Sequence, residues 1–345
     1  MVIDVRSPAE FAEDHVPGAV NLPVLSDAER AEVGTIYVQE SRFRARRIGA
    51  ALIARNVARH LETALAEKDG AFRPLIYCWR GGQRSHAMAT ILSQVGWRTG
   101  LLKGGYKTYR RHVSAALYDA EAPHRLVLLE SPTGCAKTEL LGLVAGLGVQ
   151  TLDLEGLAAH RGSLFGAIPG AAQPSQKMFE SRLLSALQAL DPARPVLVES
   201  ESSKIGERMI PPALWRLMEA APRITLSAPL EARARYLVSA YREITEDPAA
   251  LDDILARVPD RPGAKRLAEW RALAAAGAFE ALAAALMELH YDPAYRRSSR
   301  RDERPQLGAI ALDRLDPAGL QQAAAQISSL LVDAAERLPR AAVRA

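Results

Sequence analysis

Strand and helix patterns alternate along this chain in two series, and no other feature constrains its fold as strongly. In the first series, short apolar segments such as residues 2–6 and 74–78 are each followed by a segment with apolar residues at helical spacing. The polar stretch 118–124 interrupts the pattern, and a second series begins with the apolar segment 125–130. Strands that alternate with helices form parallel sheets covered by helices. We therefore expect two α/β domains.

Changes in composition along the sequence predict the domain boundaries. The first α/β domain is expected over residues 1–117, a linker over 118–124, a second α/β domain over 125–245 and a helical C-terminal region over 246–345. The last region is predicted to be helical because it is rich in alanine and ends in one more helical pattern.

Two elements are predicted with specific bounds from local pattern alone. Apolar residues at helical spacing predict one long helix over residues 44–68. The apolar positions of VQTLDLEGL predict a strand over residues 149–157.

The overall composition is that of an ordinary globular protein. The chain has 345 residues, of which 48% are hydrophobic and 24% are charged, so it has enough apolar residues for two cores. It contains no run of about 18 apolar residues that would predict a membrane span, and its first residues do not resemble a secretory signal. Its two cysteines, Cys78 and Cys135, make a poor disulfide framework. We expect a cytoplasmic protein with reduced thiols.

The positive charge of the chain is concentrated in short segments. The formal net charge is +4, and basic residues cluster at 42–47, 106–112 and 295–304. Such clusters attract polyanions and are typical of nucleic-acid-binding surfaces. The alternative interpretation is an arginine-rich composition that reflects a GC-rich genome.

The segment YCWRGGQRS at residues 77–85 places a thiol at the end of a predicted strand. A helix N-terminus and nearby arginines lower the pKa of a thiol, and two successive glycines allow backbone N–H groups to surround an anion. The predicted catalytic residues are Cys78, Arg80, Gly81, Gly82, Arg84 and Ser85. The alternative is a buried cysteine beside an ordinary glycine turn.

A second loop, SPTGCAKT at residues 131–138, resembles a P-loop in outline. Lys137 and Thr138 could hold phosphates and Mg²⁺, but Ser131 and Ala136 replace both glycines of the motif. The predicted diphosphate-binding residues are Thr133, Gly134, Cys135, Ala136, Lys137 and Thr138. The bulkier residues would tune the pocket away from a nucleoside triphosphate, and a disabled phosphate site is the alternative.

Further polar residues are expected near the carboxyl ends of the strands in the second domain. Open α/β sheets bind ligands at that edge, and no metal-ligand set is predicted there. The predicted tRNA or substrate contacts are Arg161, Gln176, Lys177, Glu199 and Lys204. The alternative is a solvated loop and a capped helix.

Residues 2–24 and 75–111 resemble a rhodanese domain through DVRSPAEF, HVPGAVNLP and YCWRGGQRS. A rhodanese that transfers sulfur usually has four residues between the cysteine and the arginine, whereas five separate Cys78 from Arg84. Five is the spacing of the related dual-specificity phosphatases, and a wider loop suits a tetrahedral, phosphate-like donor. Two chemistries fit, chalcogen transfer and phosphate-ester hydrolysis. Tyr77 stands where such phosphatases usually have histidine, which favours chalcogen transfer.

Residues 2 to about 300 resemble the tRNA 2-selenouridine synthase family, a rhodanese-like domain followed by a P-loop NTPase-like α/β domain with a helical extension. LDLEGLAAHRGSLFG, QPSQKMFESRLL, VLVESESSKIG and PLEARARYLVSAY carry this resemblance. It implies replacement of sulfur by selenium from selenophosphate in 2-thiouridine, at the wobble position of tRNAs for Lys, Glu and Gln. It also implies transfer of a geranyl group from geranyl diphosphate to that sulfur, with the geranylated nucleoside as the intermediate.

The resemblance implies roles for the two loops. Cys78 would carry selenium or assist its delivery, and Arg80, Arg84 and the glycines would hold the selenophosphate oxyanion. Lys137 and Thr138 would ease departure of the diphosphate. Mg²⁺ is a candidate cofactor, tRNA is the expected partner together with the selenophosphate-producing enzyme as a candidate, and no membrane association is expected.

Alternative functions remain open from the sequence. One is a cysteine-dependent phosphatase or sulfurtransferase fused to a kinase-like P-loop domain, and another is a non-catalytic RNA-binding module. Family members usually carry a further strand before the position where this sequence starts, so we expect an unpaired sheet edge in the first domain.

Overall fold

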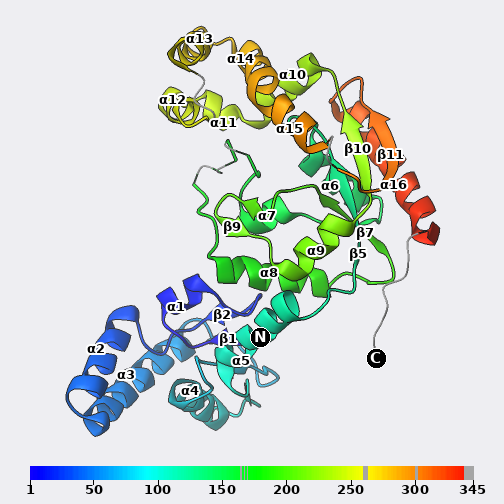
Figure 1. The fold of residues 1–345 in the computed structure, drawn as a ribbon. Coiled ribbons are helices and arrows are strands. Elements are labelled where there is room, and N and C mark those ends of the chain that lie inside the picture. Colours follow the sequence, from blue (N-terminus) through cyan, green and yellow to red (C-terminus); the bar gives the residue numbers. More distant parts are fainter. Residues whose placement is uncertain (164, 167, 169, 259–262, 300–301, 338–345) are drawn as a thin grey trace. The chain divides into compact units, whose positions relative to one another are not determined.

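The chain folds into two compact units, each with its own parallel sheet (Figure 1). The computed structural model describes residues 1–163, 165–166, 168, 170–258, 263–299 and 302–337. One unit contains residues 1–120 and 174–185, and the other contains 121–173 and 186–345. The predicted α/β fold class is confirmed. Arg300 and Arg301 of the predicted basic segment lie outside the described residues.

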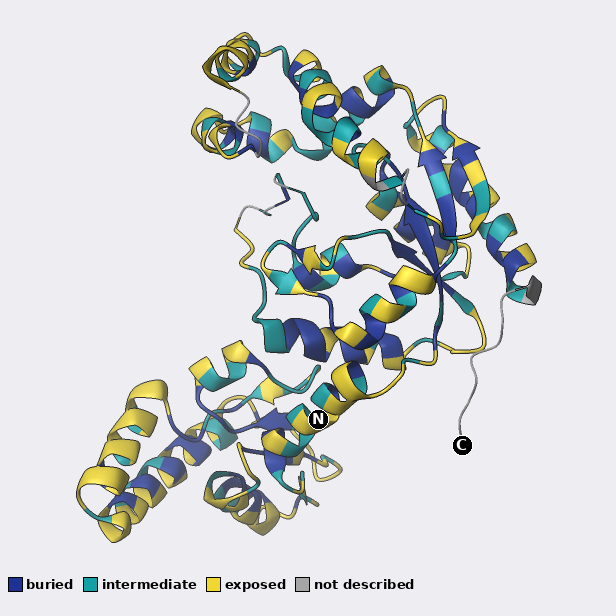
Figure 2. Cartoon of the chain, in the orientation of Figure 1, coloured by how far each residue is buried: buried dark blue, intermediate teal, exposed yellow. Residues whose placement is uncertain are grey.

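The first unit is built on four short parallel strands. In order across the sheet these are β2 (Val20–Asn21), β1 (Val2–Asp4), β3 (Leu75–Tyr77) and β4 (Gly100–Leu101). Its helices are α1 (Pro8–Glu13), α2 (Asp27–Gln39), α3 (Arg42–Glu62), α4 (Gln83–Gln94), α5 (Gly105–Ser114), the π-helix η1 (Ala115–Asp119) and most of α8 (Gln176–Gln188). Ile3 and Ile76 of the central strands are fully buried in one core with Met88 and Leu92 of α4, as the dark strands in Figure 2 show.

The prediction of one helix over 44–68 is wrong at its C-terminal end. The helix α2, which precedes it, was not predicted. The helix α3 stops at Glu62, and in the turns that follow the amide of Leu65 donates to the carbonyl of His60. Leu65 is 1% exposed, so the chain leaves the helix to bury this side chain. The preceding helix α2 has almost no helical periodicity in its apolar residues, which explains why the pattern did not predict it.

The second unit has five parallel strands. Across the sheet they are β11 (Gln306–Ala311), β10 (Arg223–Ser227), β5 (Arg125–Glu130), β7 (Pro195–Glu199) and β6 (Gln150–Leu152), and β8 (Lys204–Ile205) with β9 (Arg208–Met209) forms a separate antiparallel pair. The strands that follow β5 in the chain lie on both of its sides. Open α/β sheets bind ligands beyond the carboxyl end of a strand at such a switch point.

The helices of the second unit either cover its sheet or pack in a core of their own. They are α6 (Lys137–Gly146), α7 (Leu154–Ala158), α9 (Pro212–Ala220), α10 (Leu230–Ala240), α11 (Arg242–Thr245), α12 (Pro248–Ala256), α13 (Gly263–Ala275), α14 (Phe279–Leu286), the π-helix η2 (Met287–Tyr291), α15 (Asp292–Ser299) and α16 (Pro317–Arg337). Helices α11 to α14 share a core of their own around Leu251, Trp270 and Leu282. Over the described part of the chain, no helix combines the length and the apolar character that a membrane crossing needs.

Two predictions for the second unit need correction. The strand predicted over 149–157 ends at Leu152, because Asp153 accepts a hydrogen bond from the amide of Gly156 at 2.7 Å and so caps α7. The region after residue 245 is largely helical, as predicted, but it also contains the strand β11, which pairs with β10. Gly308 of β11 lies against Leu330 of α16, so this strand is held by packing that a local pattern does not reveal.

Candidate active sites

The thiol of Cys78 lies in the loop between β3 and α4. The side chain is 3% exposed. Its Sγ atom accepts a hydrogen bond from the amide of Gly82 at 3.2 Å and lies 3.2 Å from the hydroxyl oxygen of Ser85. The loop therefore directs hydrogen-bond donors from the start of α4 toward the sulfur, as the sequence predicted.

These contacts favour the thiolate form of Cys78. Burial acts most strongly and would raise the pKa of the thiol, but the hydroxyl and amide of Ser85, the amide of Gly82 and the charge of Arg84 together lower the pKa below its usual value. A thiol with a lowered pKa is a better nucleophile near neutral pH than an ordinary cysteine.

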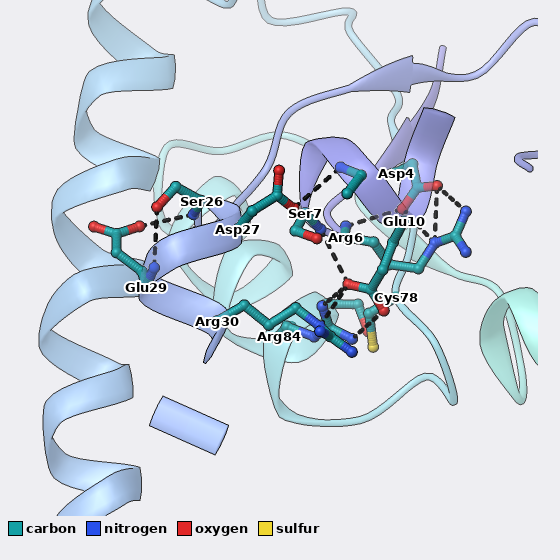
Figure 3. Close-up of polar contacts among 12 residues, drawn as sticks. Asp4, Arg6, Ser7, Glu10, Ser26, Asp27, Glu29, Arg30, Cys78 and Arg84 are labelled. Carbon is teal, nitrogen blue, oxygen red and sulfur yellow. Dashed lines mark hydrogen bonds and ion pairs between the residues drawn. The ribbon is translucent and has the colours of Figure 1, made fainter. Parts of the chain in front are cut away.

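Arg84 is held beside the thiol by an acidic partner that is distant in sequence and was not predicted. Its two Nη atoms donate to the carboxylate of Glu10 at 2.7 and 3.4 Å, and Arg30 contacts the same carboxylate at 3.1 Å. Figure 3 shows these side chains converging next to Cys78. Burial opposes ionisation of Glu10, but the two arginines and the amide of Ser7 lower its pKa. Arg80, in contrast, is exposed on the loop.

The loop that carries Cys78 is supported by the first turn of α5. The amide of Tyr106 donates to the carbonyl of Cys78 at 2.9 Å, and the amide of Lys107 donates to the next carbonyl at 2.9 Å. Gly105 has φ of 59°, and a Cβ there would overlap the carbonyl oxygen of Cys78 and the amide of Gly81. The glycine turn before α5 is therefore a required part of the site.

A buried charged group fixes Tyr106 in this position. The guanidinium of Arg6 pairs with Asp4 at 2.6 Å and lies 3.9 Å from the centre of the Tyr106 ring. The hydroxyl of Tyr106 donates to Asp14 at 2.6 Å. Buried charges persist only when they are paired. These contacts therefore tie α5 to β1 and fix the position of the Cys78 loop, which α5 supports.

The P-loop of the second unit follows β5 and leads into α6. All six predicted diphosphate-binding residues, from Thr133 to Thr138, line one cavity of about 430 Å³. Gly134 and Ala136 have φ of 88° and 57°, so the loop adopts left-handed backbone at the position where the motif has its second glycine. An alanine in that conformation costs roughly 1–2 kcal/mol. The loop therefore keeps the left-handed backbone of the motif although alanine replaces its second glycine.

Cys135 lies in the same loop but differs from Cys78 in its chemistry. The residue is 1% exposed, and burial raises the pKa of its thiol despite the nearby charges of Arg233 and Lys137. It is therefore a poor nucleophile and serves as a packed residue of the loop.

Acidic side chains face the lysine of the P-loop. Thr138 donates its hydroxyl hydrogen to Glu155 at 2.9 Å, and both Glu155 and Glu201 line the cavity. Burial raises the pKa of Glu155. Burial also raises the pKa of Glu201 to about 7, with Lys137 opposing the rise and Glu155 adding to it.

The predicted role of Glu199 as a substrate contact is wrong. The residue is fully buried, and its Oε1 atom accepts the amide of Glu155 at 2.8 Å. Burial holds the pKa of Glu199 well above its usual value. Glu199 therefore positions α7, and Glu201, two residues later, is the acid at the cavity.

The other predicted contacts do not gather at one place. Arg161 lines the P-loop cavity, pairs with Glu243 at 2.5 Å and lies 4.7 Å from the ring centre of Tyr241. Lys204 pairs with Glu207 at 3.2 Å on the β8–β9 hairpin.

Gln176 and Lys177 belong to the first unit, so their predicted place at the edge of the second sheet is wrong. Lys177 pairs with Glu13 at 2.6 Å, and Gln176 donates to Glu180 at 3.0 Å. Glu180 in turn accepts from Arg110 of α5. These polar contacts hold the start of α8 within the first unit.

The fold and the two loops define the class of protein. A parallel sheet with a cysteine loop at a strand end is a rhodanese-like domain, and the rhodanese-like family matches residues 1–112. A parallel sheet with a phosphate-type loop after its central strand is a P-loop α/β domain. The family described as the tRNA 2-selenouridine synthase AAA domain matches residues 124–254.

Relatives over most of the chain identify the family. A protein from Chromohalobacter salexigens is 37% identical over 325 residues, which cover 86% of this chain and 87% of that one. Proteins from Nitrosomonas europaea and Cupriavidus necator are 35% and 38% identical, over 70% of this chain and 63% and 65% of theirs. All three are named tRNA 2-selenouridine synthase. The chain belongs to the tRNA 2-selenouridine synthase family.

The hydrogen bonds at Cys78 predict the effect of removing one donor. Ser85→Ala removes the hydroxyl beside the sulfur, so we expect the pKa of the thiol to rise and its alkylation by iodoacetamide to require higher pH. The measurement is the alkylation rate of Cys78 against pH, with Ser93→Ala at the other end of α4 as the matched control. An unchanged profile for Ser85→Ala would show that the hydroxyl does not stabilise the thiolate.

The left-handed conformation of Ala136 predicts an unusual effect on stability. Ala136→Gly removes the steric cost of that conformation, which outweighs the entropy lost by glycine, so the free energy of unfolding should rise by about 0.5 kcal/mol. Ala325→Gly, at an exposed position in the interior of α16, is the control and should lower it by roughly 0.5–1 kcal/mol. Urea denaturation measures both, and equal losses for the two variants would contradict the strain.

Proposed function

We propose that this protein converts 2-thiouridine to 2-selenouridine at the wobble position of tRNA in the cytoplasm, through an S-geranylated intermediate. One observation carries the proposal: each unit has its own loop for a phosphate-like anion, one built around a nucleophilic thiol and the other around a lysine. Two such loops suit a reaction with two phosphate-containing donors, selenophosphate and geranyl diphosphate. The names of the relatives support the overall reaction.

In the first step the P-loop cavity would hold the diphosphate of the geranyl donor. The sulfur of 2-thiouridine attacks C1 of the geranyl group, the C1–O bond breaks, diphosphate leaves, and the uridine loses its N3 proton. Lys137 and the loop amides stabilise the negative charge that develops on the diphosphate. Alkylation turns the sulfur into a better leaving group for the second step.

The acids in the cavity fit a divalent cation that accompanies the diphosphate. Two carboxylates, Glu155 and Glu201, would otherwise repel the ligand. Among the described residues, no group of three or more histidine, cysteine or acidic side chains could hold a metal ion. We propose that Mg²⁺ enters with the diphosphate and contacts Thr138 and Glu155, because it favours oxygen ligands and phosphates.

In the second step the Cys78 loop would release selenium from selenophosphate. Selenium already has the oxidation state that it has in the product, so no oxidant or reductant is needed. The thiolate attacks phosphorus, the P–Se bond breaks and hydrogen selenide leaves, while Gly82 and its neighbours stabilise the phosphoryl oxygens. Water then cleaves the S–P bond, which releases phosphate and restores the thiol.

Hydrogen selenide would complete the exchange on the nucleoside. It adds to C2 of the S-geranylated uridine, the C2–S bond breaks, and its two protons go to N3 of the uridine and to the departing geranyl thiolate. The products are 2-selenouridine and geranylthiol. In this scheme Cys78 assists selenium delivery and does not carry selenium, and Arg84, already oriented by Glu10, faces the phosphoryl group.

The basic start of α3 supports tRNA as the substrate. Arg42, Arg46 and Arg47 are exposed there, beside Phe43, whose side chain is 76% exposed. Arginines that neutralise phosphates and an aromatic ring that stacks on a base are typical of RNA-binding surfaces. We expect the tRNAs for Lys, Glu and Gln as substrates, and the selenophosphate-producing enzyme as a partner.

Single variants should separate the two steps. The full chain is incubated with a 2-thiouridine anticodon stem-loop, geranyl diphosphate, Mg²⁺ and selenophosphate, and the nucleoside mass is measured. Cys78→Ala should accumulate the S-geranyl nucleoside without selenation. Lys137→Ala should lower the geranylation rate by about 100-fold or more, as expected when a charge that stabilises the leaving group is lost.

Lys265→Ala at an exposed position of α13 is the control for loss of a lysine in the same unit and should keep both steps. Selenation by Cys78→Ala at the normal rate would overturn the role of the thiol. Geranylation by Lys137→Ala at the normal rate would overturn the role of the P-loop.

The five-residue spacing between Cys78 and Arg84 favours a second candidate function, hydrolysis of phosphate esters. The first half of the proposed selenium step, attack of a thiolate on phosphorus, is the same chemistry. An aryl phosphate tested under the same conditions distinguishes the two functions. Turnover that depends on Cys78, with no selenation of the stem-loop, would identify a phosphatase.

A further inference from the structure

An apolar cavity adjoins the P-loop cavity within the second unit. It has a volume of about 80 Å³ and shares four lining residues with the P-loop cavity: Thr133, Ser163, Leu237 and Tyr241. The rest of its wall comes mainly from α11, α14 and η2 and is largely aliphatic or aromatic, with Ile244, Leu251, Phe279, Leu282, Leu286 and Met287 among its residues. A phosphate-type loop and an apolar chamber therefore meet at a common wall.

The common wall reaches the phosphate loop itself. Leu237 of α10 lies so close to Gly134 that a Cβ at that glycine would be 3.1 Å from the Cγ atom of Leu237. Tyr241, at the end of the same helix, lies under the guanidinium of Arg161, another residue of the P-loop cavity. A ligand whose phosphates lie on the loop would thus place its next atoms against Leu237 and Tyr241.

We infer that the P-loop ligand is amphiphilic and that this apolar cavity receives its hydrocarbon tail, with Phe279 limiting the length of the tail. The inference rests on the proposed function, since it takes the ligand to be a prenyl diphosphate. The polar base and ribose of a nucleotide would find few partners on these walls, whereas a hydrocarbon tail is stabilised there by the loss of water-exposed apolar surface.

The volume of the cavity indicates a short tail. A cavity of about 150 Å³ is known to accept benzene, and this one has about 80 Å³. The cavity therefore suits the distal part of a tail, and the part nearest the diphosphate would lie along Leu237 and Tyr241. A tail placed partly in the cavity and partly along these two residues suits a ten-carbon chain better than a fifteen-carbon chain.

The far end of the cavity is closed by residues that also border a second space. Thr245, Leu251 and Phe279 line both the apolar cavity and a neighbouring cavity of about 310 Å³. The neighbouring cavity also has Ala274 and Ala275 in its wall. Phe279, the first residue of α14, is the largest side chain of this partition. Its truncation should join the two spaces and make room for a longer tail.

The direct test is calorimetric binding of three probes to the full chain in the presence of Mg²⁺: inorganic diphosphate, geranyl diphosphate and farnesyl diphosphate. Geranyl diphosphate should bind at least about tenfold more tightly than inorganic diphosphate, because burial of only two methylene groups accounts for that factor. Farnesyl diphosphate should bind more weakly than geranyl diphosphate. Equal affinities for all three probes would overturn the inference.

Two variants test the cavity from opposite directions. Phe279→Ala should raise the affinity for farnesyl relative to geranyl diphosphate by at least about tenfold, since one further isoprene unit gains an apolar site. Ala283→Leu should fill the cavity and reduce the affinity for geranyl diphosphate to that for inorganic diphosphate. Ala283 lines the cavity and lies in α14.

Each variant has a matched control in the same group of helices. Leu273→Ala truncates a side chain that packs against the same core but lines neither cavity, and Ala281→Leu enlarges an exposed position of α14. Both should keep the order of affinities of the natural chain. If Phe279→Ala fails to fold, Ala283→Leu still decides the outcome, because retained preference for geranyl diphosphate in that variant would contradict the inference.

The binding of inorganic diphosphate separates this inference from the proposed function. If the natural chain does not bind diphosphate, or Lys137→Ala binds it equally well, the P-loop site of the proposed function is wrong. If diphosphate binding depends on Lys137 but the tail adds no affinity, only the assignment of the apolar cavity is wrong.

Discussion

Both sites depend on one constraint: the chain must leave a buried parallel strand and enter a helix within five or six residues while its amides face inward. Left-handed backbone at Gly81, Gly134 and Ala136 meets this constraint. In the first unit the loop has a second support, since the first amides of α5 hold the carbonyls behind Cys78. The position of the thiol, and the donors that lower its pKa, follow from these backbone contacts.

Each loop combines a cation with a carboxylate. Arg84 is paired with Glu10, and Lys137 shares its cavity with Glu155 and Glu201. The ion pair with Glu10 holds Arg84 in place before a ligand arrives, which favours a preorganised site. In both loops the carboxylates reduce the net positive charge, so an anion must gain its affinity from backbone donors, from an accompanying metal ion or from another part of the ligand. The apolar cavity beside the P-loop would supply the last of these.

The sequence predicted the parts of the fold that local pattern determines. The strand β5 has the predicted bounds, and both loops lie at strand ends as expected. Helix α2 and strand β11 were not predicted, because their apolar residues lack a clear period and their stability comes from packing, as at Gly308.

Within the sites, the residues adjacent to each motif were predicted and their distant partners were not. Glu10 and Gly105 reach Cys78 and its loop only through the tertiary fold. Glu199 is the last residue of β7 and Glu201 lies two residues later, and only burial distinguishes the positioning residue from the acid at the cavity. Gln176 and Lys177 follow the second unit's motifs in sequence but pack in the first unit.

The most direct test of two separate donor sites uses two variants in succession, one defective in selenation and the other defective in geranylation. The S-geranylated stem-loop made by Cys78→Ala is purified and given to Lys137→Ala with selenophosphate but without geranyl diphosphate, and the nucleoside mass is measured. Conversion to 2-selenouridine is expected at close to the rate of the natural chain, because Lys137→Ala keeps the Cys78 loop. Recovery of the geranylated nucleoside unchanged would contradict the assignment of the two steps to separate donor sites.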